Sequence, residues 1–169
     1  MNNASAYQVA QFNWGILKAD WDDPVVADFV DNLDRVKSVA HRSRGFVWQM
    51  PSDQMEAAQN SPGGILGSNP RLASTLSIWN TAEDLEAFVH QTIHNAFLKR
   101  RDEWYEKGTQ KLKGNAFPRY VIWPVIAGHR PDLAEAVDKL KRLDAFGSSE
   151  DVYDFRYLSA QRSVTEATA

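Results

Sequence analysis

Apolar residues recur at helical spacing in three stretches of the chain, and each stretch begins at residues typical of a helix N-terminus. We expect the first helix from about Pro24 to His41, where Asp23 precedes a proline at the first helical position. The second begins after Thr81 and continues, with a kink, to Lys107. The third spans Asp132 to Leu143.

Four shorter segments rich in aromatic and β-branched residues predict strands. They are 7–14 (YQVAQFNW), 46–50 (FVWQM), 72–79 (LASTLSIW) and 120–127 (YVIWPVIA). Pro124 suits an edge strand or a bulge in the last of them.

The segments between these elements are expected to be irregular. Glycine and proline mark 51–70 and 108–118 as loops, and the first is long enough to be a mobile flap. Residues 148–156 look extended, and the polar tail 159–169 is expected to be flexible.

The order of these elements predicts an α+β fold of the ferredoxin-like type, βαββαβ with a C-terminal helix. Its four-stranded antiparallel sheet would carry helices on one face only. A bare sheet face with Trp and Tyr side chains cannot stay exposed, so we expect a second copy to cover it in a homodimer, a dimeric α/β barrel. Residues 1–158 are expected to form a single domain that ends in the flexible tail.

Composition excludes several classes of site and partner. The chain has 169 residues and no cysteine, so disulfides, thiolate metal sites and cysteine nucleophiles are absent. A formal net charge of −3 gives no strong attraction to nucleic acid or to an anionic membrane, and we expect neither as a partner. No apolar run reaches the length of a signal peptide or a membrane span, which predicts a cytoplasmic protein.

Two histidines, His90 and His94, lie one turn apart on the second predicted helix. This is the spacing of a zinc-protease helix, but Gln91 stands where the general base, a glutamate, would be. Together with Glu86 the pair either forms a metal-binding stripe or is simply a polar helix face. No further ligand motif stands out, so no metal is assigned.

Further candidates for chemistry are His129 and Arg101. His129 lies in a Gly-His-Arg-Pro turn and is either a capping residue or a site residue. Lys99, Arg100 and Arg101 precede Trp104 and Tyr105 and form either a solvated helix end or a clamp for phosphate or carboxylate with aromatic stacking. Arg101 lies seven residues after His94 and therefore on nearly the same helix face.

Six tryptophans are unusual in a chain of this size, and four of them fall one per predicted strand: Trp14, Trp48, Trp79 and Trp123. They either fill the core or line a pocket on the bare face of the sheet. Trp79 shares its strand face with Thr75 and Ser77, which favours the pocket for this residue.

Three long segments resemble an uncharacterised bacterial family, a domain of unknown function. They are PVVADFVDNLDRVKSVAHRSRGFVWQM, SIWNTAEDLEAFVHQTIHNAFLKRRDEWY and VIWPVIAGHRPDLAEAVDKLKRL. The positions that match the family pattern are Asn13, Asn32, Asp34, Arg35, Gly45, Phe46, Trp79, His94, Arg101, Trp104, Pro124, Gly128 and His129.

This resemblance implies a ferredoxin-like dimeric α/β barrel, distantly similar to antibiotic-biosynthesis monooxygenases and to spheroidene monooxygenase. It does not identify a reaction. Because relatives in this superfamily bind haem, it also implies a haem-ligand role as one option for His94.

We therefore expect a small-molecule enzyme, monooxygenase-like or a cofactor-independent tailoring enzyme of secondary metabolism, acting on a hydrophobic aromatic or polyketide-like substrate. The expected catalytic residues are His94, Asn13, Arg101 and His129. The expected substrate-binding residues are Gln11, Trp14, Gln49, Trp79, Trp104 and Trp123. The alternative is a non-catalytic dimeric protein that binds haem, or another small hydrophobic ligand, in the same pocket.

Overall fold

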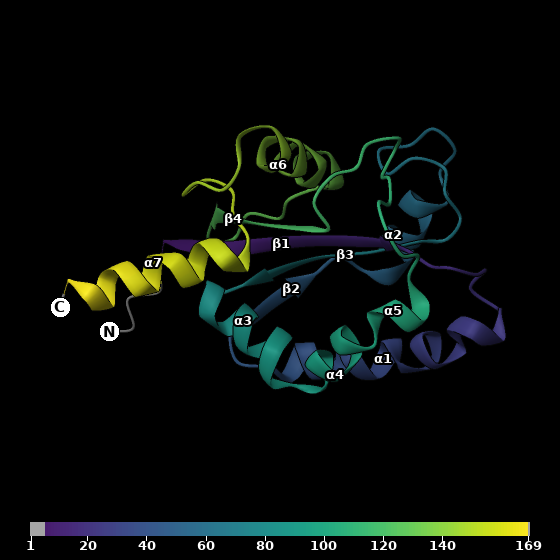
Figure 1. Cartoon of the computed structure of the whole chain (residues 1–169), viewed down its shortest axis with the longest axis horizontal. Helices are drawn as coiled ribbons and strands as arrows, with labels where there is room; N and C mark the ends of the chain where they lie inside the picture. Colours follow the sequence, from purple (N-terminus) through teal and green to yellow (C-terminus); the bar gives the residue numbers. More distant parts are fainter. Residues whose placement is uncertain (1–5, 169) are drawn as a thin grey trace.

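A four-stranded antiparallel sheet lies at the centre of the computed structural model, which describes residues 6–168 (Figure 1). The strands are β1 (Tyr7–Ile16), β2 (Phe46–Gln49), β3 (Leu72–Trp79) and β4 (Tyr120–Ile126). Their order in the sheet is β2-β3-β1-β4. The four predicted strands are confirmed, and the chain is a mixed α+β protein.

The two faces of this sheet differ in chemistry because alternate residues of a strand point to opposite sides. In the pairing of β1 with β3, Gln11 lies opposite Ser77 and Asn13 lies opposite Thr75. We call this side the polar face, and the other side, which includes Phe12, the apolar face. The two central strands therefore present amides and hydroxyls to one layer of the protein and hydrocarbon to the other.

Helices cover the polar face (Figure 1). They are α1 (Ala27–Arg42), preceded by the 3-10 turn η1 (Pro24–Val26), then α3 (Ala82–Gln91), α4 (Ile93–Lys99) and α5 (Arg101–Trp104). Near the β2 end of the sheet, Trp79 packs in one apolar cluster with Leu85, Phe88 and Val89 of α3. Apolar residues therefore make the contact between this helical layer and the sheet, and the polar side chains of β1 and β3 lie beside that contact.

The apolar face is also covered, which corrects the expectation of a bare face. Helix α6 (Leu133–Phe146) packs Leu133, Val137 and Leu140 into the same cluster as Phe12 and Trp123. Helix α2 (Ser52–Gln59) adds Met55 to this cluster. The third predicted helix, which is α6, is amphipathic, and its apolar stripe packs against the apolar face of the sheet in the same chain.

Three segments differ from the sequence-based expectation. The predicted flap 51–70 contains α2, the long second helix is divided at Thr92 and Arg100, and the polar tail is largely helical as α7 (Phe155–Ala167). Residues 148–156 join the sheet only through an isolated bridge between Ile122 and Tyr153. Short helices with few apolar residues, such as α2, leave little periodic signal in a sequence.

Helix α7 projects from the body of the molecule, with the C-terminus at its far end (Figure 1). Asp154 caps it by accepting a hydrogen bond from the Tyr157 amide. A two-bond ion pair joins Arg162 to Glu86 of α3, with N···O distances of 2.6 and 2.8 Å. Within residues 6–168, no helix has the length and apolar character needed to cross a membrane.

Candidate functional site

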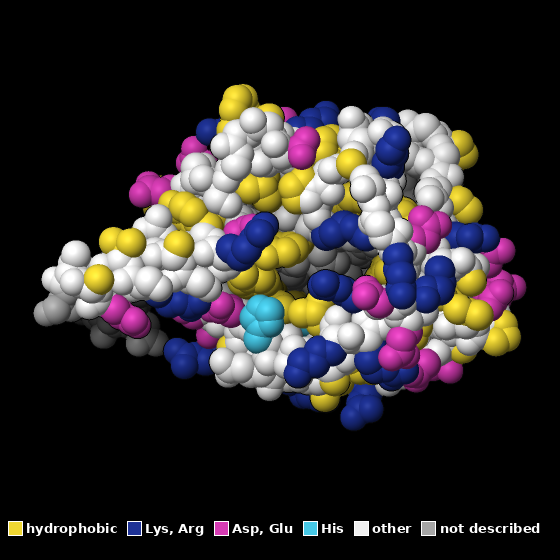
Figure 2. Space-filling view, in the orientation of Figure 1, with side chains coloured by type: hydrophobic (Ala, Val, Ile, Leu, Met, Phe, Trp, Pro, Cys, Tyr) yellow, Lys and Arg dark blue, Asp and Glu magenta, His cyan; other side chains and the backbone are white. Residues whose placement is uncertain are grey.

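A cavity of about 1770 Å³ opens where the helices α1, α3, α4 and α5 stand over the polar face of the sheet. Figure 2 shows this side of the molecule hollowed near its middle, with Lys and Arg side chains around the hollow. The lining residues used below are Gln11, Asn13, Trp14, Thr75, Ser77, His94, Arg101, Tyr105 and Arg119. Large cavities that combine apolar walls with a few polar groups are the usual places for small-molecule binding.

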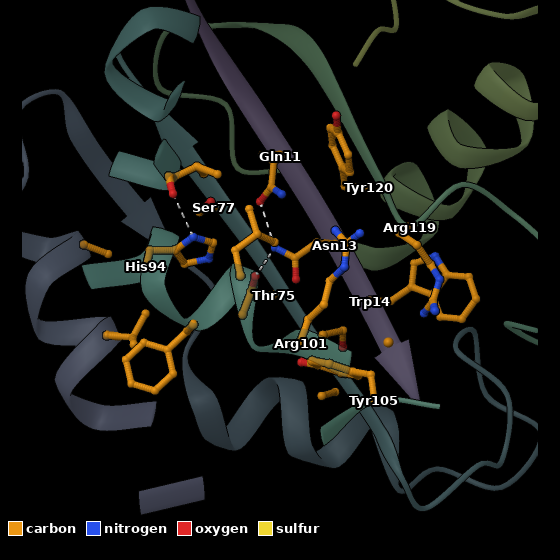
Figure 3. A pocket seen from close by; sticks show the side chains of 18 of the residues that line it. Gln11, Asn13, Trp14, Thr75, Ser77, His94, Arg101, Tyr105, Arg119 and Tyr120 are labelled. Atoms are coloured by element: carbon orange, nitrogen blue, oxygen red, sulfur yellow. Dashed lines mark hydrogen bonds between the residues drawn. The ribbon is translucent and has the colours of Figure 1, made fainter. Parts of the chain in front are cut away.

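Hydrogen-bonded amides and hydroxyls from β1 and β3 form the floor of the cavity (Figure 3). The Asn13 side-chain amide donates to Gln11 Oε1 at 3.1 Å and to Thr75 Oγ1 at 2.7 Å. Trp79 Nε1 donates to Ser77 Oγ at 3.1 Å. These bonds fix the Asn13 amide and leave its oxygen and the Gln11 NH₂ group without a hydrogen bond to another described residue. A bound molecule would find both an acceptor and donors here.

His94 faces this floor from the helical layer, and a break in the helix positions it. The chain leaves α3 at Thr92, whose backbone is extended and whose hydroxyl accepts a hydrogen bond from the His94 amide at 3.2 Å. Helix α4 therefore begins at Ile93, directly before His94, and the His94 ring points toward the sheet (Figure 3). Thr92 supplies the N-cap that such a restart requires.

The environment of His94 keeps its ring neutral. Burial lowers the pKa of His94 from its ordinary value of 6.5, and the nearby His90 lowers it further, against the raising effect of the Val89 carbonyl. Nδ1 lies 3.3 Å from that carbonyl oxygen. A proton on Nδ1 makes this hydrogen bond and leaves the lone pair on Nε2, which is the arrangement of a general base or of a metal-ligating imidazole.

Two arginines stand on another side of the cavity. Arg101 reaches in from α5, and Arg119 lies beside Trp14 at the start of β4 (Figure 3). The Arg119 guanidinium stacks on the Trp14 ring at 4.9 Å and donates to Gln110. Burial lowers the pKa of Arg119, and the positive charge of Arg101 lowers it further, although Glu106 opposes this.

Tyr105 completes this side of the cavity. Its ring lies against the backbone of β1 at Gly15, where a Cβ atom would come within 2.5 Å of the ring. Burial raises the pKa of Tyr105, so its hydroxyl stays protonated and is a hydrogen-bond donor. Only glycine at this position of β1 lets the ring approach so closely.

Most of the predicted site residues line the cavity: His94, Asn13, Arg101, Gln11, Trp14, Gln49, Trp79 and Trp104. Their lining atoms come from β1, β2, β3, α4 and α5, which are distant in sequence. The cavity lies under the helical layer of a single chain, whereas the sequence places the pocket on a bare sheet face.

Two predicted residues lie elsewhere. His129 is exposed on the opposite side of the sheet, where Nε2 is 2.7 Å from Glu135 Oε2. Trp123 is fully buried on the apolar face, and its Nε1 donates to Glu135 Oε1 at 2.9 Å. Both residues therefore serve the contact between β4 and α6. Trp48, the remaining strand tryptophan, packs against the apolar cluster as well.

The stripe of Glu86, His90 and His94, for which the sequence left a metal site and a polar helix face open, is not arranged as a metal site. Glu86 is engaged by Arg162, which lowers the pKa of the Glu86 carboxyl. Among residues 6–168 no group of three or more His, Asp or Glu side chains is arranged to hold a metal ion. His94 presents a nitrogen suited to ligation, Nε2, because Nδ1 lies against the Val89 carbonyl.

The sequence did not indicate Arg119, and it indicated Tyr105 only as a neighbour of the basic patch 99–101. Arg119 follows a loop that offers no periodic pattern, and Tyr105 follows the last turn of a broken helix. Their roles depend on contacts with Trp14 and Gly15 of β1, which no local signal in the sequence announces.

Comparison with known proteins gives a family and, among the solved structures, a protein of unknown function. The family described as Domain of unknown function (DUF3291) matches residues 8–168, and no curated protein matches. The crystal structure of NE2512, a protein of unknown function from Nitrosomonas europaea, is similar with a TM-score of 0.44 and 12% sequence identity, over 75% of this chain and 95% of that one. Neither description names a reaction or a monooxygenase. The chain belongs to the DUF3291 family.

Proposed function

We propose that this protein is an enzyme that transforms a small hydrophobic metabolite in the cavity under the helical layer, with His94 as the general acid–base. The observation that carries the proposal is the half-buried His94 ring, whose pKa burial lowers, opposite a strip of hydrogen-bonding side chains. A neutral imidazole whose pKa lies near the operating pH can accept a proton from a substrate and return it, and such proton transfer accelerates a reaction about 10²–10⁴-fold.

The floor of the cavity would orient the substrate. The Asn13 oxygen accepts a hydrogen bond and the Gln11 NH₂ group donates one, so together they can hold a hydroxyl or carbonyl oxygen of the substrate near His94. Trp79, next to Ser77 on the same strand, belongs to the apolar cavity wall. A cofactor-independent tailoring reaction that starts with proton abstraction suits this set of groups best, and monooxygenase-like chemistry would begin with the same step.

Profiling by mass spectrometry tests this function without a known substrate. Purified protein is incubated with a metabolite extract, and consumed or formed compounds are recorded for the wild type and for His94→Gln. We expect at least one compound to change with the wild type and to change at least 100-fold more slowly with the variant. The control is His41→Gln, an exposed histidine of α1 outside the cavity. Equal turnover by wild type and His94→Gln would refute the role of His94.

A second candidate is a non-catalytic protein that binds haem through His94. It is supported by the hydrogen bond from Nδ1 to the Val89 carbonyl, because haem-ligating histidines are oriented by such a bond and present Nε2 to the iron. Haem would supply redox chemistry at this site when bound. The absorption spectrum of protein supplied with hemin decides the matter: a Soret band that His94→Ala loses supports this candidate, and no band in the wild type refutes it.

The finer architecture belongs to the same proposal. The antiparallel sheet order β2-β3-β1-β4, with α1 and α3 on one face, supports a ferredoxin-like core to which α6 and α7 are added. The homodimer is also part of this proposal, although α6 and α2 cover the apolar face and a second copy is not needed there. The projecting helix α7, with Val164 exposed, is the surface that a second copy would cover.

A further inference from the structure

The two arginines of the cavity, Arg101 and Arg119, form weaker ion pairs than the neighbouring Arg100. Arg119 makes no ion pair within 4.0 Å to another described residue, and its guanidinium donates only to the neutral Gln110 amide. Arg101 has a single weak pair, to Asp102 at 3.8 Å, and both of these side chains are largely exposed. Elsewhere on the surface, Arg100 contacts both Asp28 and Glu103 at 2.6 and 2.7 Å.

Arg119 is held rigidly although no acid pairs with it. Gln110, which is 4% exposed, accepts from Arg119 and also from the backbone amide of Ile16 at 2.6 Å. The flat Trp14 ring supports the other side of the guanidinium. A half-buried guanidinium fixed by a neutral amide and an aromatic ring keeps its charge available, and desolvation strengthens its attraction to an anion.

The two positive charges act on each other across the cavity. Both side chains line the same cavity, Arg101 from α5 and Arg119 from the segment just before β4 (Figure 3). The charge of Arg101 also lowers the pKa of Arg119, after the larger effect of burial. Bringing like charges together costs free energy that an anion between them would recover. The protonated hydroxyl of Tyr105, which has no hydrogen-bond partner among the described residues, lines the same part of the cavity.

We propose that the ligand of this cavity is an apolar carboxylate whose carboxyl group is bound between Arg101 and Arg119, with Tyr105 as an additional donor. The inference rests on the proposed function, since it names the substrate class of that site. Planar guanidinium groups match carboxylates in geometry and donate two parallel hydrogen bonds. The acids Asp102 and Glu106 also line the cavity and disfavour a dianion such as phosphate.

Matched ligand pairs test the proposal directly. Tryptophan fluorescence or calorimetry measures binding of benzoate, 2-naphthoate and decanoate, each against the neutral alcohol of the same carbon skeleton. We expect the wild type to bind at least one carboxylate at least tenfold more tightly than its alcohol, with the preference falling as salt rises. Arg119→Gln and Arg101→Gln should each reduce this preference to less than threefold while leaving the affinity for the alcohol unchanged.

Controls separate the anion site from folding and from the proposed function. Arg35→Gln removes an exposed arginine of α1 that does not line the cavity, and it should keep the preference. Should Arg119→Gln fail to fold, Arg101→Gln alone decides, because the Arg101 side chain is 65% exposed. Equal binding of acids and alcohols by the wild type would overturn the carboxylate assignment and leave the small-molecule cavity standing. Binding of none of the six compounds would overturn both.

Discussion

At the scale of single residues, His94 makes folding sensitive to pH. Its pKa is lowered in the folded state by burial and by His90, so just below pH 6.5 the unfolded chain binds more protons than the folded one. The stability contributed by this difference is complete above the unfolded pKa and is lost as the pH falls toward the folded pKa. His94→Gln should therefore lose less free energy of unfolding than the wild type as the pH falls.

The measurement is the free energy of unfolding by denaturant between about pH 8 and about pH 5 for both proteins. The difference between wild type and His94→Gln should shift in favour of the variant as the pH falls, whereas His41→Gln should follow the wild type. A difference independent of pH would show that His94 titrates as a free histidine does.

The residue scale also shows how much of the site the sequence could indicate. Asn13, Gln11 and Trp79 were found from strand alternation and family resemblance, and all three line the cavity. Period-two alternation fixes which residues share a sheet face. It cannot say which layer covers that face, and the face that lines the cavity was therefore expected to be bare, whereas α1, α3, α4 and α5 cover it.

At the scale of elements, the break between α3 and α4 matters most for the site. Thr92 Oγ1 donates to the Phe88 carbonyl at 2.6 Å and accepts from the His94 amide at 3.2 Å, so one hydroxyl ends one helix and begins the next. In a continuous helix, the residues after Thr92 would follow the axis of α3 and their side chains would point in other directions. The sequence predicts a kink in this region without locating it, because Thr92 has no helix-breaking neighbour.

Thr92→Ala should lower the free energy of unfolding by about 1 kcal/mol, since the N-cap of α4 loses its side-chain hydrogen bond. Thr92→Ser keeps the hydroxyl and should retain most of the stability. Imidazole NMR signals of His94 should move in the alanine variant and stay in the serine variant. If both variants leave these signals in place, the cap does not position the ring.

At the scale of the whole molecule, the part of α7 that follows Leu158 contributes little to the folded core, whereas Phe155, Tyr157 and Leu158 in its first turn pack against it. Residues 159–168 are all exposed, and the contact of this segment with α3 is the exposed pair of Arg162 with Glu86. Exposed ion pairs contribute about 0–1 kcal/mol. A chain that ends at Leu158 should therefore unfold with nearly the same free energy, within about 1 kcal/mol of the full chain.

Denaturant unfolding of the two proteins checks this prediction, and a loss of several kcal/mol would show that residues 159–168 stabilise the core. Light scattering on the same samples measures the oligomeric state. Twice the mass of the chain supports the proposed homodimer, and dissociation on truncation would assign its interface to α7. A mass of one chain for the full-length protein would rule the dimer out.

The sequence by itself determined the four strands, the start of the three main helices and the absence of thiolate chemistry, because these follow from local periodicity, capping residues and composition. It also supplied His94 and Arg101 as chemical candidates. Only the tertiary structure decided that α6 covers the apolar face, that the cavity lies beneath the helical layer, and that Arg119 joins Arg101 there. These features are contacts between segments far apart in the chain. Their free energy depends on which surfaces pack together, and no local sequence pattern specifies that.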